Sequence, residues 1–280
     1  MKILAFSGAH GNRQVTEAFI GRVGDLKDRP DIYISAGDLG PISMLGILTN
    51  LSEHGVPVLY VHGNHILHHP GSVVELCLQR IRKLPGVHHI GDSTFEHLGW
   101  SFIGQDALTD FTDDKNDPGR YHDLLERSRG VDPGSTVLVT HHAPLGIFDV
   151  GSSYPLHSYT DRSGAIHAGS LAVRFFVDRF VPRIHIFAHC HADGNRSSMI
   201  DGTLFANICH LERRTGDGDY GITGSFGIVD TERMKVMTYQ LSQTSPRTCP
   251  GCGDVNYIRY RRCVNCTKGS TGIISREDLP

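Results

Sequence analysis

The sequence predicts an α/β protein built on a mostly parallel β-sheet, with a second, more antiparallel sheet stacked against it. Two observations support this fold class. Short apolar runs alternate with amphipathic helical segments over roughly the first 190 residues, as expected for strands joined by crossover helices. Beyond that point, hairpin signals replace the alternation. The chain of 280 residues is long enough for one large domain and a small one.

Each predicted strand of the first part of the chain ends in polar residues. The five apolar runs are Ile3–Phe6, Ile32–Ser35, Val58–Val61, Val137–Thr140 and Ile184–Ala188. Helical spacing of apolar residues predicts helices over 15–26, 45–51 and 74–81, between the early strands. Because ligands of parallel sheets bind beyond the carboxyl ends of the strands, the polar residues at those ends are the candidate functional residues.

Two hairpins are predicted after residue 190. Segments 198–200 and 203–208 flank Asp201-Gly202, a strong signal for a tight hairpin turn. Segments 226–229 and 235–239 form a second pair. We therefore expect these segments to build the second sheet.

Two polar segments lack periodicity, and each contains candidate substrate-contacting residues. Residues 106–123 are predicted to form a loop, and residues 149–169 are compatible with a lid. The candidate side chains on them, which are equally compatible with ordinary surface positions, are Arg120, His122, His157, Arg162 and His167. Residues 242–248 have the composition of a linker, so we expect a body over residues 1–242 and a tail over residues 243–280.

Composition limits the class of protein. A net charge of −3 argues against a chain that binds nucleic acid through its whole surface. No apolar run approaches the roughly 20 residues of a membrane span, and the run after Lys2 is too short for a signal peptide. We therefore expect a cytoplasmic protein without a membrane partner. Four of the seven cysteines lie within 249–266, which favours a metal site over a disulfide framework.

The strand ends share residue types that bind divalent metals. Carboxylate, amide and imidazole groups are ligands for Zn, Mn, Fe or Ni. A single such residue is more often a helix cap or a structural histidine, but five strand ends of this kind are difficult to explain in that way. The residues are His10, Asp38, Asn64, His65, His141, His189 and His191.

The order of these residues resembles the calcineurin-like metallophosphoesterase superfamily. The corresponding stretches are "AHGN", "AGDLG", "HGNH", "THHAP" and "AHCH", and they extend over residues 3–191. The resemblance implies a four-layer α/β/β/α sandwich with a dinuclear metal centre at the strand ends, and a metal-dependent phosphohydrolase acting on a phosphoester. "AGDLGPIS" lacks the Asp-Arg pair that phosphoprotein phosphatases of this superfamily carry, which favours a phosphodiesterase.

The resemblance also implies roles for individual residues. Asp38 would bridge two metal ions, and Asn64, His141 and His189 would complete the shell of one ion. His10 and His191 would bind the other ion. His65 would act near the substrate oxygen, either stabilising charge or protonating the leaving group. His142 is an alternative to His141, but His141 directly follows the strand and matches the Thr/Ser-His pattern of the superfamily.

Three residues depart from the superfamily pattern. Gly8 stands where an aspartate is expected, Ile66 where an acidic residue often occurs, and Ala188 where a glycine occurs. Without the carboxylate at position 8, one ion is expected to bind tightly and the other weakly, and Gly8→Asp is expected to raise metal content or rate. The same departure leaves open a different class of function, a metal-degenerate scaffold that binds a partner.

The tail contains two C-x2-C pairs within "CPGCGDVNYIRYRRCVNC". Thiolates spaced in this way suit one structural zinc ion and resemble a zinc ribbon, and an iron site like that of rubredoxin is the main alternative. In a segment of fewer than 40 residues, the metal would be the main source of order. The four expected ligands are Cys249, Cys252, Cys263 and Cys266.

The tail is basic, whereas the body is acidic. Residues 243–280 contain six Lys or Arg against three Asp or Glu, a net charge of +3 that leaves −6 for the body. Basic side chains interleaved with aromatic ones are typical of single-stranded nucleic-acid binding. A nucleic-acid processing phosphodiesterase, a protein partner, contact with the acidic body and a solvated strand all remain open. The residues concerned are Tyr257, Arg259, Tyr260, Arg261 and Arg262.

Overall fold

Strand β1 shows how the sequence builds layers. It spans Lys2–Phe6 and pairs in parallel with β2, which spans Ile32–Ser35. Ile3 and Ala5 face a core that lies between two sheets. Leu4 and Phe6, which alternate with them, face a separate core beneath helices. Because both faces of the strand are buried, it is a continuous apolar run rather than an alternating one.

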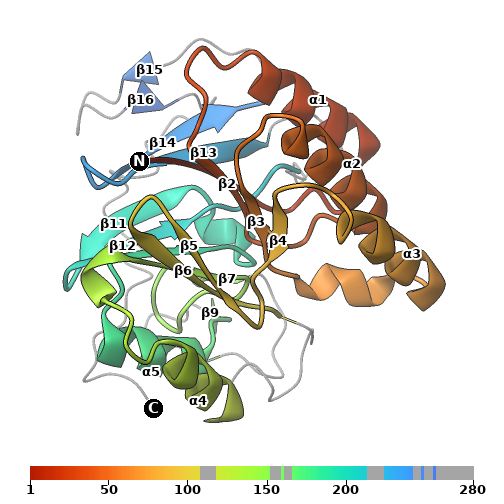
Figure 1. Ribbon diagram of the computed structural model, residues 1–280. Coiled ribbons are helices and arrows are strands. Elements are labelled where there is room, and N and C mark those ends of the chain that lie inside the picture. Colours follow the sequence, from red (N-terminus) through yellow and green to blue (C-terminus); the bar gives the residue numbers. More distant parts are fainter. Residues whose placement is uncertain are drawn as a thin grey trace.

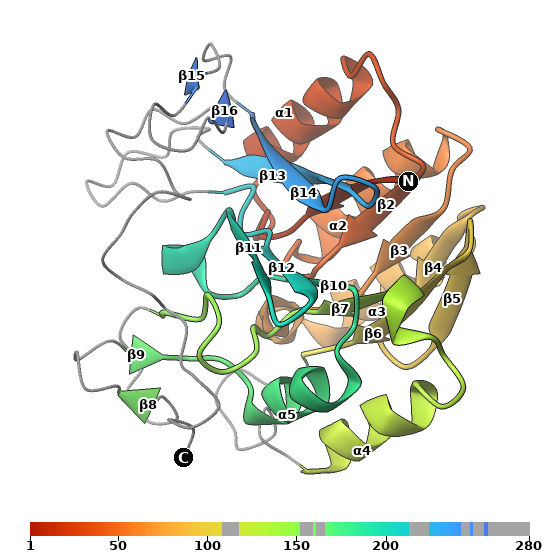
Figure 2. The same cartoon turned by 90° about the vertical axis from the view of Figure 1, so that its left-hand side faces the viewer.

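The computed structural model describes residues 1–107, 118–151, 159–160, 166–212, 224–241, 247–248 and 255–256. Two six-stranded sheets face each other, and helices cover their outer faces, which gives a four-layer α/β/β/α sandwich (Figures 1 and 2). The predicted fold class is therefore confirmed for these residues.

The first sheet has the strand order β14-β13-β1-β2-β3-β4. Strands β1 to β4 are parallel, whereas β13 and β14 are antiparallel to their neighbours. Its further strands are β3 (Val58–Tyr60), β4 (Val87–His89), β13 (Ser225–Asp230) and β14 (Lys235–Gln240). Its outer face is covered by α1 (Arg13–Gly24), α2 (Pro41–Ser52) and α3 (Gly71–Ile81).

The second sheet has the order β11-β12-β10-β7-β6-β5. Its strands are β5 (Thr94–His97), β6 (Trp100–Gln105), β7 (Thr136–Thr140), β10 (Ile184–Phe187), β11 (Arg196–Ile200) and β12 (Thr203–Asn207). Helices α4 (Pro118–Arg127) and α5 (Leu171–Phe180) cover its outer face. The short elements are η1 (Asn64–His68), η3 (Pro133–Ser135), η4 (His191–Asp193), β8 (Tyr159–Thr160), β9 (Ile166–His167), β15 (Arg247–Thr248) and β16 (Val255–Asn256).

The five predicted strands, the three predicted helices and both hairpins are present, but the division into sheets differs. The two hairpins do not make one antiparallel sheet. Strand β13 adds to β1 and β12 adds to β10, so one hairpin extends each sheet and both sheets are mixed. Strands β7 and β10 belong to the second sheet rather than to the first. Which edge a hairpin joins depends on contacts between distant residues, which local patterns do not contain.

One segment predicted as a loop is partly helical. Helix α4 begins at Pro118, inside the segment 106–123. Proline suits the first turn of a helix, and the buried Leu124 anchors this helix on the second sheet. Residues 108–117 lie outside the described residues. Within the described part of the chain, no helix combines the length and apolar character that crossing a bilayer requires.

A buried histidine on β10 couples folding to pH. Nε2 of His185 lies 2.9 Å from Oγ1 of Thr140, whose hydroxyl donates to the carbonyl oxygen of His142. The imidazole therefore donates through Nε2, and its buried Nδ1 has no hydrogen-bond partner among the described residues. Burial lowers the pKa of His185 from 6.5 to about 3.

This lowered pKa predicts a loss of stability in acid. Below pH 6.5 the unfolded chain binds a proton at His185, and the folded chain does not until about pH 3, so stability falls as pH falls through that window. We expect His185→Gln to flatten the acid limb of the unfolding free energy by up to about 1.4 kcal/mol per pH unit. Urea unfolding between pH 6.5 and 4 in chelator measures this slope. An exposed histidine provides the control, His122→Gln, and parallel curves for His185→Gln and the parent would contradict the prediction.

Candidate metal centre

Three of the candidate ligands at the strand ends have strained backbone conformations. His10, Asp38 and His189 follow β1, β2 and β10, and they have φ angles of 47°, 55° and 67°. Left-handed backbone is costly for residues other than glycine, so surrounding contacts must hold it in place. The peptide N–H of His10 donates to the carbonyl oxygen of Asp38 at 2.9 Å, which joins two of these loops. Such strain is concentrated at functional sites.

Two glycines allow the loops to approach one another. A Cβ at Gly63 would lie 2.2 Å from Oδ1 of Asp38, and a Cβ at Gly37 would lie 2.7 Å from Nδ1 of His141. The Gly-Asp and Gly-Asn-His stretches therefore need glycine because backbone packs directly against the candidate ligands. A side chain at either position would displace the carboxylate or the imidazole.

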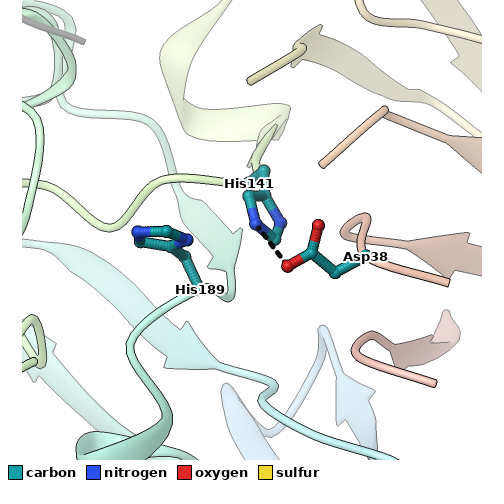
Figure 3. Close-up of side chains that lie close together, drawn as sticks. All are labelled: Asp38, His141 and His189. Carbon is teal, nitrogen blue, oxygen red and sulfur yellow. Dashed lines mark ion pairs between the residues drawn. The ribbon is translucent and has the colours of Figure 1, made fainter. Parts of the chain in front are cut away.

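Asp38, His141 and His189 converge on one point (Figure 3). Their ligand atoms all lie within 4.8 Å of one another, and Nε2 of His141 is 3.2 Å from Oδ2 of Asp38. The same Nε2 lies 2.9 Å from Oδ1 of Asn64. These four residues come from the ends of β2, β7 and β10 and from η1, so the centre lies where the carboxyl edges of both sheets meet.

His141 is oriented through its other ring nitrogen. Nδ1 of His141 donates to the carbonyl oxygen of Ala36 at 2.7 Å, which leaves Nε2 to face Asp38 and Asn64. Metal-binding histidines are commonly fixed in this way, by a hydrogen bond from the second nitrogen to a carbonyl group. Two acceptor oxygens around one ring nitrogen require a cation between them, either a proton or a metal ion. This donor set fits a divalent metal.

The electrostatics of the buried pair agree with this geometry. Burial alone would raise the pKa of Asp38, but the imidazoles of His141, His10 and His189 outweigh it and hold that pKa well below its ordinary value. Burial alone would lower the pKa of His141, but Asp38 and the hydrogen bond to Ala36 raise it. The carboxylate therefore stays ionised, and it attracts positive charge to this point.

A second group of imidazoles lies beside Asp38. The ring centroid of His10 is 4.9 Å from that of His65 and 5.2 Å from that of His191. Nε2 of His10 is buried without a hydrogen-bond partner among the described residues. Burial, followed by the charges of nearby histidines such as His191, lowers the pKa of His10 to about 3 despite the opposing effect of Asp38. A neutral imidazole with an unsatisfied buried nitrogen is suited to bind a metal ion.

The structure brings all seven candidate residues of the metal centre together where the carboxyl edges of the two sheets meet, and His65 is oriented by its neighbours. The peptide N–H of His65 donates to Oδ1 of Asp38 at 2.8 Å, and its Nδ1 lies 3.3 Å from Nε2 of His69. His142 also lies near, with its ring centroid 4.9 Å from that of His189. The four tail cysteines, and the tyrosines and arginines between them, lie outside the described residues.

The candidate substrate-contacting residues have different positions. His167 is buried, and its Nδ1 lies 2.6 Å from Oδ1 of Asp149, so it belongs to the interior rather than to an exposed lid. Arg120 donates to the carbonyl oxygen of Asp106 at 2.6 Å and lines a pocket. His122 lies exposed on α4. His157 and Arg162 lie outside the described residues.

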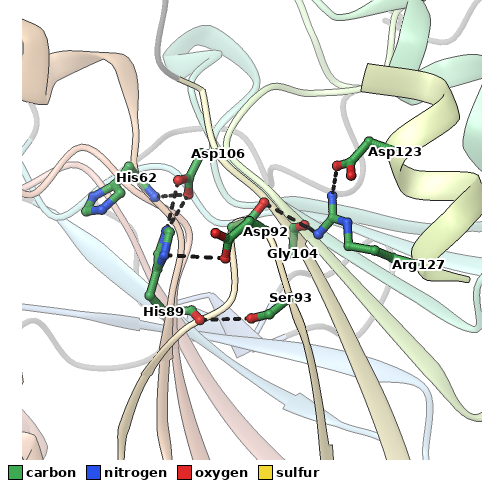
Figure 4. Close-up of polar contacts among 9 residues, drawn as sticks. His62, His89, Asp92, Ser93, Gly104, Asp106, Asp123 and Arg127 are labelled. Atoms are coloured by element: carbon green, nitrogen blue, oxygen red, sulfur yellow. Dashed lines mark hydrogen bonds and ion pairs between the residues drawn. The ribbon is translucent and has the colours of Figure 1, made fainter. Parts of the chain in front are cut away.

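A second cluster of ligand-type side chains, formed by His62, His89 and Asp106, was missed from the sequence (Figure 4). Its ligand atoms also lie within 4.8 Å of one another. Asp106 accepts hydrogen bonds from the peptide N–H of His62 at 2.6 Å and from Nε2 of His89 at 2.8 Å. The cluster thus ties the ends of β3 and β4 to the end of β6, across the two sheets. The position of His62 directly after a strand was the available signal.

This cluster lines a pocket that passes beside the Gly-Asn-His stretch. The pocket has a volume of roughly 900 Å³ and is lined by Ile66 and His69, which follow His65 along the chain. Arg120 lies on its wall, together with apolar side chains of α3. The pocket therefore lies beside the short helix η1, which carries Asn64 and His65.

A further histidine, His210, was also missed. It is 8% exposed, and its ring stacks on that of His191 with centroids 4.5 Å apart and planes inclined by 16°. It follows β12, a strand whose polar end gave no candidate ligand from the sequence. Its proximity to residues 8–10 arises from pairing between segments some 200 residues apart, such as the hydrogen bond from the peptide N–H of Leu211 to the carbonyl oxygen of Ser7 at 2.7 Å.

A four-layer sandwich with aspartate, asparagine and histidine at the facing strand ends is the arrangement of the metallophosphoesterases. The chain belongs to the calcineurin-like phosphoesterase family, whose model matches residues 1–193. This places it among the phosphoesterases and agrees with the resemblance inferred from the motifs.

Individual relatives are more distant. A probable cyclic nucleotide phosphodiesterase of a Synechococcus species is 29% identical over 127 residues, which are 44% of this chain and 46% of that protein. The chain thus matches about half the length of that relative. The protein TT1561 of Thermus thermophilus covers 86% of this chain over 99% of its own length, with a TM-score of 0.58 at 15% identity. Another solved structure has the same coverage and a TM-score of 0.61 at 14% identity. At these identities the structural likenesses show the fold alone.

Proposed function

We propose that this protein is a metal-dependent phosphodiesterase. The observation that carries the proposal is the convergence of Asp38, His141 and His189 within 4.8 Å, with Oδ1 of Asn64 on the same imidazole nitrogen. Carboxylate, amide and imidazole donors suit Mn, Fe, Ni or Zn. These four residues would hold one ion, and His10 and His191 would contribute to a second ion that shares Asp38.

Divalent ions bound there would supply a metal-activated water for attack on phosphorus and a positive charge for a phosphoryl oxygen. The protein contributes an ionised Asp38, which would attract these ions to the centre. It also contributes a rigid arrangement, because Ala36 fixes the ring of His141 and Gly63 allows the backbone of η1 to approach Asp38. Positioning of this kind lowers the entropic cost of reaching the transition state.

His65 is the proposed general acid. Its backbone is anchored to Asp38, and its ring contacts His69, so the ring has a defined orientation beside the centre. An imidazole titrates close to neutral pH and can therefore donate a proton to the leaving oxygen. His69 lies on the pocket side and can exchange that proton with solvent.

Three observations support a diester rather than a phosphoprotein as the substrate. The related Synechococcus protein is described as a probable cyclic nucleotide phosphodiesterase. The stretch "AGDLGPIS" around Asp38 lacks the Asp-Arg pair that phosphoprotein phosphatases of the family carry shortly after the same Gly-Asp. The pocket lined by Ile66, His69 and Arg120 offers space for the second ester group. We therefore favour small phosphodiesters, including cyclic nucleotides.

A substrate panel tests this proposal. Protein reconstituted with Mn²⁺, Ni²⁺, Zn²⁺ or Mg²⁺ is assayed on bis-p-nitrophenyl phosphate, p-nitrophenyl phosphate, cyclic AMP and a phosphopeptide. We expect the diesters to be hydrolysed with higher kcat/KM than the monoester or the phosphopeptide, and a transition metal to be more effective than Mg²⁺. A higher kcat/KM for the monoester than for the diesters would contradict the proposal. Absence of turnover with all four metals would instead favour the scaffold interpretation.

The tail is proposed to form a zinc site of its own. Two C-x2-C pairs separated by ten residues support this proposal, and the interleaved tyrosines and arginines support contact with single-stranded nucleic acid. Such a tail would present an oligonucleotide diester to the body, which has the opposite charge. Deletion of residues 243–280 would then reduce activity on oligonucleotides while sparing the small ester.

A further inference from the structure

The space beside Gly8 is already filled. Gly8 follows β1 with a φ of +70°, and a Cβ at this position would lie 2.8 Å from Cβ of His210 and 3.4 Å from Nε2 of His10. Its backbone is fixed on both sides, because its N–H donates to the carbonyl oxygen of Gly37 and its carbonyl oxygen accepts from Glu212. A side chain at position 8 would thus project between His10 and His210. On these steric grounds we expect Gly8→Asp alone not to restore a ligand.

His210, the residue that fills this space, has an imidazole side chain, which is itself a metal-binding group. The ring of His210 stacks on that of His191 at 4.5 Å, and the ring of His191 lies 5.2 Å from that of His10. The three imidazoles therefore lie in succession, and both His10 and His210 border the space that a side chain at position 8 would enter. Nε2 of His10, the atom closest to the Cβ position of residue 8 after His210, is buried without a hydrogen-bond partner among the described residues.

We propose that His210 replaces the absent carboxylate of position 8 and that His10, His191 and His210 together bind the second divalent ion, with Asp38 shared between the ions. This inference rests on the metal centre proposed above. It explains why glycine occupies position 8, since the loop that brings His210 to the site leaves no room for a side chain there. The gap at position 8 is then an exchange of ligands rather than the loss of one.

The exchange changes the chemistry of the centre. Neutral imidazole replaces an anionic oxygen, so the pair of ions has one negative charge, that of Asp38, among its protein ligands in the described residues. Imidazole-rich sites suit Zn, Fe or Ni, whereas carboxylate-rich sites suit Mn or Mg. The second site should therefore bind Zn²⁺ or Ni²⁺ more tightly than Mn²⁺. This difference in affinity should be larger at the second site than at the Asp38–His141–His189 site.

The test counts metal ions and measures their affinity in the full chain. His210→Phe keeps an aromatic ring to stack on His191 but removes both ring nitrogens. We expect it to weaken one Zn²⁺ or Ni²⁺ site by more than the roughly 10- to 100-fold that loss of an outer-shell partner costs, and to leave the other site unchanged. Isothermal titration and elemental analysis give the affinities and equivalents. Any ion held by the tail cancels, because the tail is the same in every variant.

Further variants keep the inference falsifiable. Circular dichroism shows whether phenylalanine at position 210 disturbs folding. If it does, His210→Ala takes its place and is expected to lose the same ion. His122→Ala, at an exposed histidine, is the control and is expected to bind as the parent does. Gly8→Asp alone is expected to gain nothing, whereas Gly8→Asp with His210→Gly clears the space and is expected to regain the lost ion.

The outcome separates this inference from the proposed function. If folded His210→Phe and His210→Ala retain both ions with parental affinity, the inference is overturned while turnover of the diester by the parent still supports the function. If the parent binds two ions and His210→Phe binds one, the inference holds even where no phosphodiester is hydrolysed. Binding of one ion by the body of the parent would also overturn the inference.

Discussion

Replacing Asp38 with asparagine is expected to reduce kcat for a phosphodiester by about 1,000-fold and to release metal from both proposed sites. The physical reason is charge. Asp38 is the carboxylate that faces His141, His189 and His10, and its interaction with a metal ion is worth several kcal/mol, of which each 1.36 kcal/mol is a factor of ten in rate. Initial rates on bis-p-nitrophenyl phosphate and elemental analysis of the same sample measure both effects.

The asparagine variant isolates the charge because it preserves shape. Its side-chain oxygen can still accept the peptide N–H of His65, which lies 2.8 Å from Oδ1 of the aspartate. An exposed carboxylate offers the matched control, Asp28→Asn, which is expected to leave rate and metal content as in the parent. Parental activity in Asp38→Asn would show that the reaction does not use this centre.

His65→Gln is expected to reduce kcat by roughly 100- to 10,000-fold, the range typical of a general acid, while metal content stays at the parental level. His65 touches the centre through its backbone rather than as a proposed ligand, so its side chain can be exchanged without releasing metal. The loss should depend on the leaving group. An alkyl alcohol needs a proton as it departs, whereas p-nitrophenolate leaves readily without one, so the alkyl ester should suffer more.

The leaving-group comparison distinguishes proton donation from charge stabilisation. His68→Gln, at an exposed histidine of the same short helix η1, is the control and is expected to have little effect on either ester. If His65→Gln slows both esters equally, His65 is not the acid. A loss of metal in this variant would instead assign a structural role to His65.

Most of the fold and of the proposed site could be predicted from local patterns. Strand β1 is recognisable because burial on both faces makes a continuous apolar run, and Asp38 and His141 were noticed because they follow such runs. The helices followed from periodic spacing, and the hairpin after β11 followed from Asp201-Gly202, whose φ angles are 47° and 89°. Each of these signals lies within a few residues of the feature that it predicts.

The missed features depend on contacts between distant segments. Whether β7 joins the first or the second sheet depends on its pairing with β6 and β10. The residues of β7 alone do not indicate which strands it pairs with. The neighbourhood of Gly8 and His210 arises from segments that meet only after both sheets have formed. The absence of a carboxylate was visible in the sequence, but the side chain that occupies its place was not.

The most direct test of a metal-dependent centre is the rate of bis-p-nitrophenyl phosphate hydrolysis by metal-free protein, measured as a divalent transition metal is added back. We predict negligible turnover without metal and recovery that saturates as the Asp38–His141–His189 site and its neighbour fill, with no recovery in Asp38→Asn. Hydrolysis that persists in the metal-free protein, or that recovers equally in Asp38→Asn, would contradict the claim that this centre is a metal-dependent phosphodiesterase site.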